Sequence, residues 1–533
     1  MPSEEFTADE RARLSPYFTN LDGHVFALTN LPETVKGALF ARYSRSAKSL
    51  RRLFLDEFAD KVGESADPAA RTGSGGTAIA RAERLYARVF SEYGDDSVAQ
   101  LGGAHIACEY ASNVLTKVLE WGRLMAYLEQ STRYVPYTDK LHGRWRYHVP
   151  AELGKGLLHG RYVRVMEDAF ERYAKWIPVM HAHFERRYPK SPADSDGVYR
   201  AAIRAKALDT LRGMLPASTQ SNVGIYGTGQ AFESLLLRMR ASPLSEVRVC
   251  ADEMLIELRK VIPAFLTRVD QPDRGGRWSE YLAAARENME TLAASLPAVE
   301  AEARDEVTLT DFDPEGEIKI VAAALYAASD LPDGQLLDLA RGMTADERVA
   351  VLRAYTGDRS NRRHRPGRAF ERTTYRFDIL TDYGAFRDLQ RHRLLTLEWQ
   401  PLTTRHGCIE PAAIAEAGAS DDWNRVMDGS ADLYDAIVSA GLKAAAPYAV
   451  AMAYRVRFYM EMNAREAMHL IELRTAPQGH PAYRRVCQQM HALIAQRAGH
   501  HAIAAAMQFV DHSDVELERL NSERALERKR QQA

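Results

Sequence analysis

The two halves of this chain resemble each other, and this internal similarity limits the possible fold more than any other sequence feature. Three pairs of segments carry it: GALFAR (37–42) with AALYAA (323–328), LEWGRLMAYLEQSTR (119–133) with LQRHRLLTLEWQPLTTR (389–405), and SLLLRMR (234–240) with HLIELR (469–474). A repeat as long as a domain predicts two copies of one fold, although chance similarity between amphipathic helices is the alternative. The length agrees, since 533 residues exceed the roughly 250–300 residues at which single cores stop growing.

The spacing between matched positions shows where the two copies differ. It falls along the chain, from 286 residues between Ala38 and Ala324, to 270 between Trp121 and Arg391, to 234 between Arg240 and Arg474. The first copy is therefore expected to carry the longer insertions, chiefly around 140–205. The acidic string at 295–317 contains two prolines and lacks helical periodicity, which predicts a linker. We expect an N-terminal copy at 1–304 and a C-terminal copy at 305–533.

Most of the chain has the apolar periodicity of helices. The segments 35–58, 248–266 and 463–474 place apolar residues three and four apart, as helices packed on a core do. Candidate strands are fewer: HVFAL (24–28), IKIVAA (318–323) and TTYRFDIL (373–380). The fold class expected is helix-rich α+β.

Composition excludes several function classes. The 70 basic and 72 acidic residues give a net charge of -2, which offers no global attraction for nucleic acid or an anionic membrane. The four cysteines form no CxxC pair and the histidines no HExxH motif, so no metal site is expected. The glycine string at 72–78 lacks the lysine of a P-loop. An acidic, polar start and no apolar run of about 18 residues predict a cytoplasmic protein.

The first candidate site is EQSTRYV, with Glu129, Ser131 and Arg133. We expect it just beyond an apolar helix. There, a hydroxyl, backbone N–H groups and a bidentate guanidinium can hold one phosphate or carboxylate. The alternative is a solvated arginine at a helix end.

The second is the tripeptide Arg391, His392 and Arg393. Adjacent side chains on a helix fan out by about 100° each, so three polar groups in a row cannot share one solvated face. This predicts a helix that runs into a ligand pocket. A basic patch beside RSNRRHRPGR (359–368) is the alternative.

The third is NAREAMHLIELR (463–474). Asn463 and Arg474 are close to three helical turns apart and share one face, while Arg465 and His469, at i and i+4, share another. One helix can thus serve two ligand regions. Alternatively, its glutamates and arginines form surface ion pairs.

Together these motifs resemble the flavin-dependent thymidylate synthases, whose pattern is close to RHRxxSxxExSxRY followed by ARxVLP and NxRxLxxFxxLR segments. The first half holds ExSxR and an ARxVLP-like LRGMLP with Arg212, and the second half holds RHR and the asparagine–arginine helix. Several positions depart from the pattern: Trp121, Gly122 and Arg123 replace RHR in the first half, EWQPLTTRHG and PYAVAMA (447–453) are degraded in the second, His469 replaces a frequent asparagine, and Asp388 replaces the glutamine expected before RHR.

The resemblance implies synthesis of dTMP from dUMP with FAD, NADPH and methylenetetrahydrofolate. It implies substrate contacts from Glu129, Ser131, Arg133, Arg212, Arg391 and Arg474, cofactor contacts from Arg391, His392, Arg393, Asn463, Arg465 and His469, and catalytic roles for Arg474 and His392. Family enzymes are homotetramers with sites shared between subunits. Here one chain would imitate two subunits, and a homodimer would form a pseudo-tetramer with composite sites. Two alternatives stay open: a flavoprotein acting on another pyrimidine nucleotide, as Asp388 suggests, and an inactive nucleotide- or flavin-binding homologue.

Overall fold

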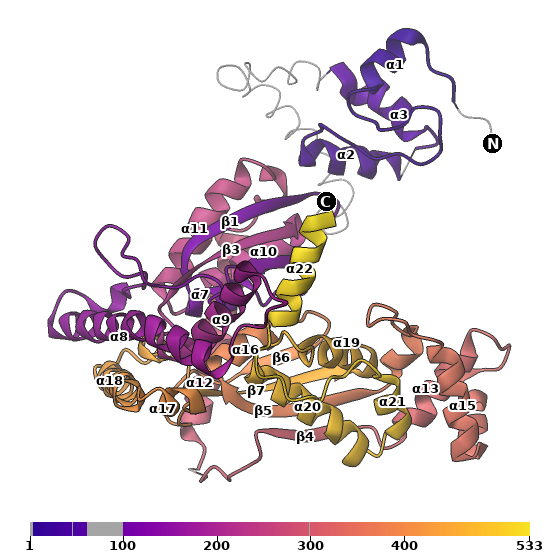
Figure 1. Cartoon of the computed structure of the whole chain (residues 1–533). Helices are drawn as coiled ribbons and strands as arrows, with labels where there is room; N and C mark the ends of the chain where they lie inside the picture. Colours follow the sequence, from indigo (N-terminus) through magenta and orange to yellow (C-terminus); the bar gives the residue numbers. More distant parts are fainter. Residues whose placement is uncertain (1–3, 45, 61–99, 298, 533) are drawn as a thin grey trace. The chain divides into compact units, whose positions relative to one another are not determined.

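The computed structural model describes residues 4–44, 46–60, 100–297 and 299–532 (Figure 1). The glycine string at 72–78 lies outside them. Two compact units are present: Met1–Glu109, Gly122–Glu129 and Asn222–Ala298 form the first, and Tyr110–Trp121, Gln130–Ser221 and Val299–Ala533 form the second. The first sequence copy contributes to both units. The boundary expected at 304/305 therefore concerns the duplication and not these units, and it stays a prediction.

The first unit contains most of a three-stranded sheet and a set of helices. Its strands, in the order β1-β3-β2, are β1 (Gly103–Ser112), β3 (Gln220–Thr228) and β2 (Met125–Glu129), and β1 and β3 continue into the second unit. Its helices are α1 (Ala8–Leu14), α2 (Glu33–Tyr43), α3 (Leu50–Leu53), η1 (Phe54–Phe58), α10 (Gly229–Arg240), α11 (Ser245–Arg259), η5 (Pro263–Leu266), η6 (Pro272–Gly276) and α12 (Arg277–Ser295). The helix predicted over 35–58 is thus interrupted after Tyr43.

The second unit is built on a four-stranded antiparallel sheet in the order β4-β5-β7-β6. Its strands are β4 (Val307–Phe312), β5 (Thr374–Asp382), β7 (Arg455–Asn463) and β6 (Thr396–Trp399). Side chains of β5 alternate between faces, so that Tyr375, Phe377 and Ile379 are fully buried. Helices α19 (Ala464–Arg474) and α20 (Pro481–Gln496) lie against the orange strands in Figure 1 and contact β4, β5 and β7.

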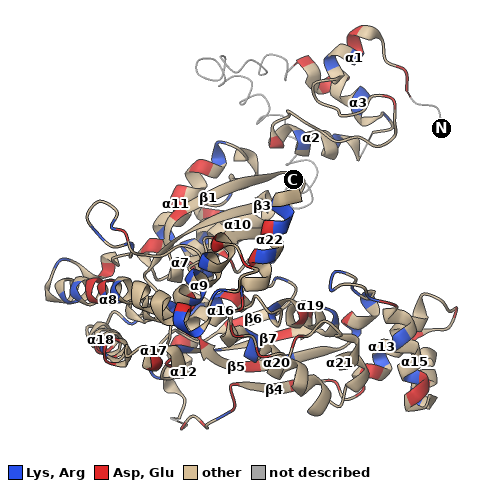
Figure 2. Ribbon diagram, in the orientation of Figure 1, with Lys and Arg blue, Asp and Glu red and all other residues tan. Residues whose placement is uncertain are grey.

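The other helices of this unit are α7 (Asn113–Leu119), η3 (Ala151–Leu153), α8 (Leu157–Arg187), α9 (Asp196–Leu211), η4 (Arg212–Met214), α13 (Gly316–Tyr326), α14 (Asp333–Gly342), α15 (Ala345–Thr356), η7 (Arg368–Arg372), α16 (Tyr383–Leu389), α17 (Ala412–Glu416), α18 (Ser420–Ser439), η8 (Ala446–Ala449), α21 (His501–Ala506) and α22 (Leu520–Gln532). Figure 2 shows basic and acidic residues interspersed along α8 and α22. No helix among the described residues is both long and apolar enough to span a membrane.

The two halves repeat one topology. The order β1-α7-β2-α8-β3-α10-α11 in the first matches β5-α16-β6-α18-β7-α19-α20 in the second, and in both sheets the third strand lies between the other two. Matched helices also share side-chain N-caps, Ser112 with Asp382 and Thr228 with Asn463, which are 270 and 235 residues apart. Helix α9 has no counterpart, since residues 440–454 hold only η8. The expected duplication, and the insertion in the first copy, are confirmed.

Three local predictions differ from the structure. TTYRFDIL is a strand as expected, but IKIVAA forms α13, because a short apolar run fits a buried helix as well as a strand. HVFAL makes only an isolated bridge between Leu28 and Phe18. The segment 295–317 is not purely a linker, since Val307 pairs with Ile379 at the sheet edge.

Candidate active site

The RHR tripeptide follows a helix but is not part of one. Helix α16 begins after its N-cap Asp382 and ends at Leu389. The next residue, Gln390, fixes this end of the helix against α7, because its side-chain amide donates to the Lys117 carbonyl at 2.7 Å. Arg391, His392 and Arg393 lie in the loop before β6, so the expectation of a helix at RHR was wrong. The loop backbone turns His392 inward and leaves Arg393 exposed.

The ExSxR segment follows a strand and not the expected helix. Glu129 is the last residue of β2, and the Ser131 hydroxyl accepts a hydrogen bond from the Arg133 backbone at 3.2 Å. The Arg133 guanidinium is buried, binds Asp209 at 2.6–2.9 Å, and donates to the Tyr483 hydroxyl at 3.3 Å. The alternative of a solvated arginine is therefore wrong.

Arginines from both sequence halves surround one carboxylate, Asp388. Arg391 forms an ion pair with Oδ1, the Nη1 atom of Arg474 lies 3.8 Å from Oδ1, and Nη1 of Arg212 lies 3.6 Å from Oδ2. Burial alone would raise the pKa of Asp388, but the charges of these three guanidiniums and of Arg133 outweigh it and hold the pKa well below its usual range. All five residues belong to the second unit.

The Arg212 side chain has a nitrogen that makes no hydrogen bond to the described residues. It lies at the end of α9 in the turn η4, is 4% exposed, and is 3.9 Å from the Asp382 carboxylate through Nη2. Nη2 has no hydrogen-bond partner among the described residues. Burial raises the pKa of Asp382 although the charge of Arg212 lowers it. The carboxyl of Asp382 is therefore less readily ionised, and it competes less with an anionic ligand for Nη2 of Arg212.

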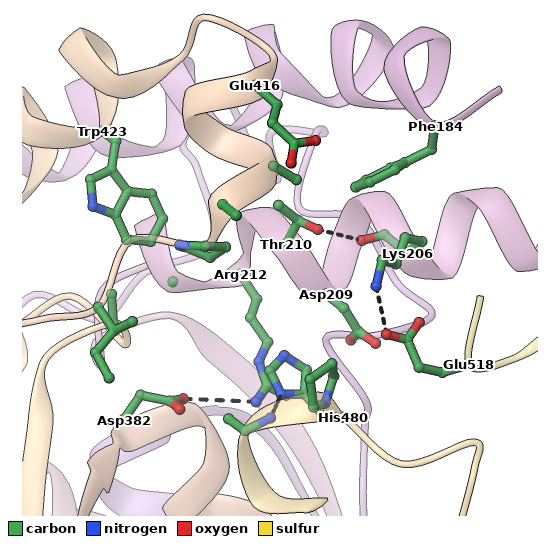
Figure 3. Close-up of a pocket in the computed structure, with 18 of the residues that line it drawn as sticks. Phe184, Lys206, Asp209, Thr210, Arg212, Asp382, Glu416, Trp423, His480 and Glu518 are labelled. Carbon is green, nitrogen blue, oxygen red and sulfur yellow. Dashed lines mark hydrogen bonds and ion pairs between the residues drawn. The ribbon is translucent and has the colours of Figure 1, made fainter. Parts of the chain in front are cut away.

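A cavity of about 350 Å³ adjoins Arg212 (Figure 3). Phe184 and Trp423 stand on opposite sides of it, and the ammonium of Lys206 donates to Glu518 at 2.5 Å across its wall. The side chains of Arg212 and Asp209 point toward the half-buried imidazole of His480. Of the site residues expected from the sequence, only Arg212 lines this cavity. This cavity therefore lies beside the arginine cluster and not at its centre.

His392 connects the cluster to helix α19. Its Nε2 atom accepts a hydrogen bond from Nε of Arg474 at 2.9 Å, its Nδ1 lies 3.4 Å from Oε1 of Glu466, and its ring centroid is 5.6 Å from that of His469. Burial lowers the pKa of His392 well below its ordinary value, with Arg474 adding to the effect. Burial likewise lowers the pKa of His469 to about 4 and raises that of Glu466 to about 7.

The donor atoms of His392, Glu466 and His469 lie within 4.8 Å of one another, as metal ligands would. Five nearby arginines act on Glu466 and His469: Arg362, Arg365, Arg393, Arg465 and Arg474. Their field opposes a bound cation and favours an anion. Arg362, Arg363 and Arg365 have no carboxylate partner within the part of the chain that the structure describes. The N–H groups of these arginines fit the pyrophosphate of a dinucleotide such as FAD, whereas their positive charge disfavours a metal ion at His392, Glu466 and His469.

Two residues expected at the cofactor already have structural partners. The Asn463 side-chain oxygen accepts from the Glu466 backbone at 2.9 Å and caps α19. Arg465 donates to the Pro366 carbonyl at 2.9 Å. The predicted alternative of surface ion pairs is wrong, because Glu466 is 5% exposed and Glu472 pairs with Arg359 in the interior at 2.6 Å.

Sequence reasoning missed several members of this cluster. Asp209 precedes Arg212 by three residues, and Glu466 precedes His469 by three, so i,i+3 spacing on a helix was the available signal. Arg362 and Arg365 belong to the segment that was considered only as a basic patch. In the structure these two arginines lie near His469, whose ring neighbours that of His392 in RHR.

This combination of a duplicated helix-rich α+β fold and an arginine-lined site agrees with the sequence comparisons. The profile of the family described as "Thymidylate synthase complementing protein" matches two segments, residues 39–264 and 308–498. The chain therefore belongs to this family, and the family resemblance predicted from the motifs is confirmed.

Two relatives match this chain over more than nine-tenths of its length. A UPF0159 protein of Chlamydia muridarum is 37% identical over 523 residues, covering 97% of this chain and 98% of the relative. One of Thermoplasma acidophilum is 31% identical over 514 residues, covering 92% and 97%. A flavin-dependent thymidylate synthase of Clostridium tetani is 26% identical over 181 residues, which are 33% of this chain and 67% of that enzyme. Among solved structures, a UMP/dUMP methylase, PolB, from Streptomyces cacaoi bound with 5-Br dUMP has a TM-score of 0.30 at 18% identity, covering 39% and 97%.

Proposed function

We propose that the protein catalyses the flavin-dependent reductive methylation of dUMP to dTMP, using methylenetetrahydrofolate and NADPH. The observation that carries the proposal is the convergence of arginines from both sequence halves on Asp388. Family membership and the named activity of the Clostridium tetani relative support it. The nucleotide would bind between the arginine cluster and the adjoining cavity, where the free Nη2 of Arg212 is the first N–H available to it.

The residues divide the work by charge. Bound FAD, once reduced, supplies the hydride, and the protein supplies binding, orientation and electrostatics. Arg133 and Arg212 would neutralise the nucleotide phosphate. The phosphate must compete with Asp209 for Arg133 and with Asp388 for Arg212, because these carboxylates already pair with the two arginines. Arg474, oriented by His392, would stabilise negative charge that develops on the pyrimidine ring. The arginines around His469 would hold the FAD pyrophosphate.

An activated thiol is not needed for this reaction. In the second unit, burial raises the pKa of Cys408 and raises that of Cys487 to about 12. Both sulfurs therefore stay protonated at neutral pH, which disfavours a thiolate nucleophile. This agrees with a flavin-dependent route and not a thiol-dependent one.

A second candidate is modification of another pyrimidine nucleotide, because Asp388 stands where the resembled family has glutamine. A carboxylate only accepts hydrogen bonds, whereas an amide also donates. The exocyclic amine of a cytosine nucleotide would satisfy such an acceptor, and uracil offers only its ring N–H.

The test begins with purified full-length protein, which should be yellow with bound FAD. Tritium should be released from 5-tritiated dUMP only with NADPH and methylenetetrahydrofolate present, and turnover of dCMP and UMP under the same conditions would separate the two candidates. Arg474→Lys, which loses the Nε–H bonded to His392, should lower kcat/KM by about 100-fold or more. The exposed Arg528→Lys on α22 is the matched control. A colourless protein without tritium release would show an inactive homologue.

A further inference from the structure

The position of the proton on His392 follows from its contact with Arg474. An arginine Nε always carries hydrogen and can only donate. Because it donates to Nε2 of His392 at 2.9 Å, that nitrogen must be the unprotonated one. The ring is neutral, since burial lowers the pKa of His392 far below its usual value. Its single proton therefore lies on Nδ1, which is the less common tautomer of free histidine.

Nδ1 of His392 lies beside the carboxylate of Glu466. Oε1 of Glu466 lies 3.4 Å from Nδ1, and the glutamate side chain is 5% exposed and the histidine side chain 4% exposed. Glu466 is in the first turn of α19 and Arg474 in its last, so one helix contacts both nitrogens of the ring. Glu466 is not part of the family motif that the sequence resembles, and it has no assigned role in the proposed reaction.

We propose that Glu466 is a positioning residue that holds His392 as the Nδ1–H tautomer and thereby orients the Arg474 guanidinium. The inference rests on the proposed function for its catalytic consequence, but the positioning itself does not depend on turnover. Without an acceptor at this place, the imidazole can carry its proton on Nε2. That N–H would then point at the Nε–H of Arg474, and two donors facing each other would push the guanidinium away.

Several titratable or charged groups face Glu466. They are His392 from the loop after α16, His469 and Arg465 from α19, Arg393 at the end of RHR, and Arg365 from the loop before η7. Burial raises the pKa of Glu466 to about 7 against the pull of these arginines. His469 has a pKa of about 4, so Glu466 is the member of the histidine–glutamate trio that changes charge near neutrality. Above about pH 7 Glu466 is a carboxylate, which can only accept; as the pH falls through that value it gains an O–H that can donate to Nδ1 and so disfavours the Nδ1–H tautomer.

The first experiment is 15N NMR of the full chain in the solid state, with histidine side chains labelled and the His392 signals identified by their loss in His392→Asn. At pH 8 the wild type should show Nδ1 protonated and Nε2 unprotonated. Glu466→Leu should move the proton to Nε2, while Glu466→Gln, whose amide oxygen still accepts, should keep it on Nδ1. A wild-type Nε2–H tautomer, or an unchanged tautomer in Glu466→Leu, would overturn the proposal.

The second experiment is the pH profile of tritium release. Wild-type kcat should be about tenfold lower at pH 6 than at pH 8, because a group with a pKa near 7 is about one-tenth ionised at pH 6. Glu466→Gln cannot ionise, so its kcat should not fall between pH 8 and pH 6, and its KM should match that of the wild type. The same tenfold fall of kcat in Glu466→Gln would contradict the assignment of this pH dependence to Glu466. If neither protein turns over dUMP, the proposed function fails, and the NMR result still decides the positioning role.

Discussion

At the scale of single residues, the unusual feature of this site is its balance of charge. Arg133 is matched by Asp209, and Arg212, Arg391 and Arg474 share Asp388. Glutamine at position 388, as in the resembled pattern, would remove the carboxylate that the last three arginines share. The acid therefore stabilises the ligand-free cluster and makes an anionic ligand compete for it.

Replacing Asp388 with asparagine tests this balance. Asp388→Asn should lower the free energy of unfolding by about 3–5 kcal/mol, because removing one partner of a buried ion pair leaves uncompensated charge. The pKa of Asp388 lies below its unfolded value, so its contribution is complete above about pH 4 and is lost only as the pH falls through the folded value. Urea unfolding should therefore show the same deficit at pH 6 and pH 8.

Ligand addition separates charge from packing. dUMP should restore more stability to Asp388→Asn than it adds to the wild type, since its phosphate can replace the lost carboxylate. Deoxyuridine, which has no phosphate, is the control and should restore little. Equal rescue by both ligands would contradict competition between Asp388 and the phosphate.

At the scale of elements, helix α19 supports the whole site. Its N-cap Asn463 fixes where the helix begins, Glu466 and Arg474 contact the two nitrogens of His392, and the buried pair of Glu472 with Arg359 anchors its far side. The resemblance assigns Asn463 to the cofactor, but its side-chain oxygen is used within the helix. Its role in capping can be measured apart from any role in binding.

Asn463→Ala should cost about 1 kcal/mol of folding stability, the usual value of a lost N-cap. Asn463→Asp keeps the accepting oxygen and should be close to wild type in urea unfolding. If the free amide N–H₂ also contacts FAD, both variants should bind FAD more weakly in a fluorescence titration. Normal FAD affinity in Asn463→Asp would limit Asn463 to capping.

At the scale of the whole molecule, the duplication has been used unequally. Within the second unit, equivalent segments pair reciprocally: Ala217 N–H donates to the Val450 carbonyl at 2.8 Å and Met452 N–H to the Leu215 carbonyl at 2.9 Å, around the bridge between Pro216 and Ala451. The 235-residue offset between the copies relates Pro216 to Ala451, Ala217 to Met452 and Leu215 to Val450. It therefore exchanges the two hydrogen bonds, as a twofold axis does at an interface between identical subunits. This internal pairing agrees with the expectation that one chain imitates two subunits, which stays a prediction.

At the second set of equivalent positions the residue types differ. By the 235-residue offset, the position equivalent to Arg212 is Pro447. By the 270-residue offset, the positions equivalent to Arg391 and His392 are Trp121 and Gly122. We therefore predict one FAD per chain in an absorbance titration, and a homodimer by light scattering with two flavins per dimer. Two flavins per chain would show that the degraded positions still form a site.

The sequence predicted the identity of the site better than its geometry. Arg133 and Arg212 from one half, and Arg391, His392 and Arg474 from the other, lie in one unit as the split motif suggests. Their ligand-binding roles stay predictions. The helix expected at RHR was wrong because the chain leaves α16 at Gln390, whose side chain bonds to α7 across the repeat. No local pattern contains that contact.

By itself, the sequence determined the fold class, the duplication and the residue types available for an anion site, because periodicity, repeated segments and motif spacing are properties of neighbouring residues. Only the tertiary structure decided which charges cancel. Asp209, Asp388 and Glu466 acquire their roles from partners up to 176 residues away, as in the ion pair of Arg212 with Asp388, and from burial that shifts their protonation. Desolvation and charge pairing depend on distance in space, which one-dimensional spacing does not contain.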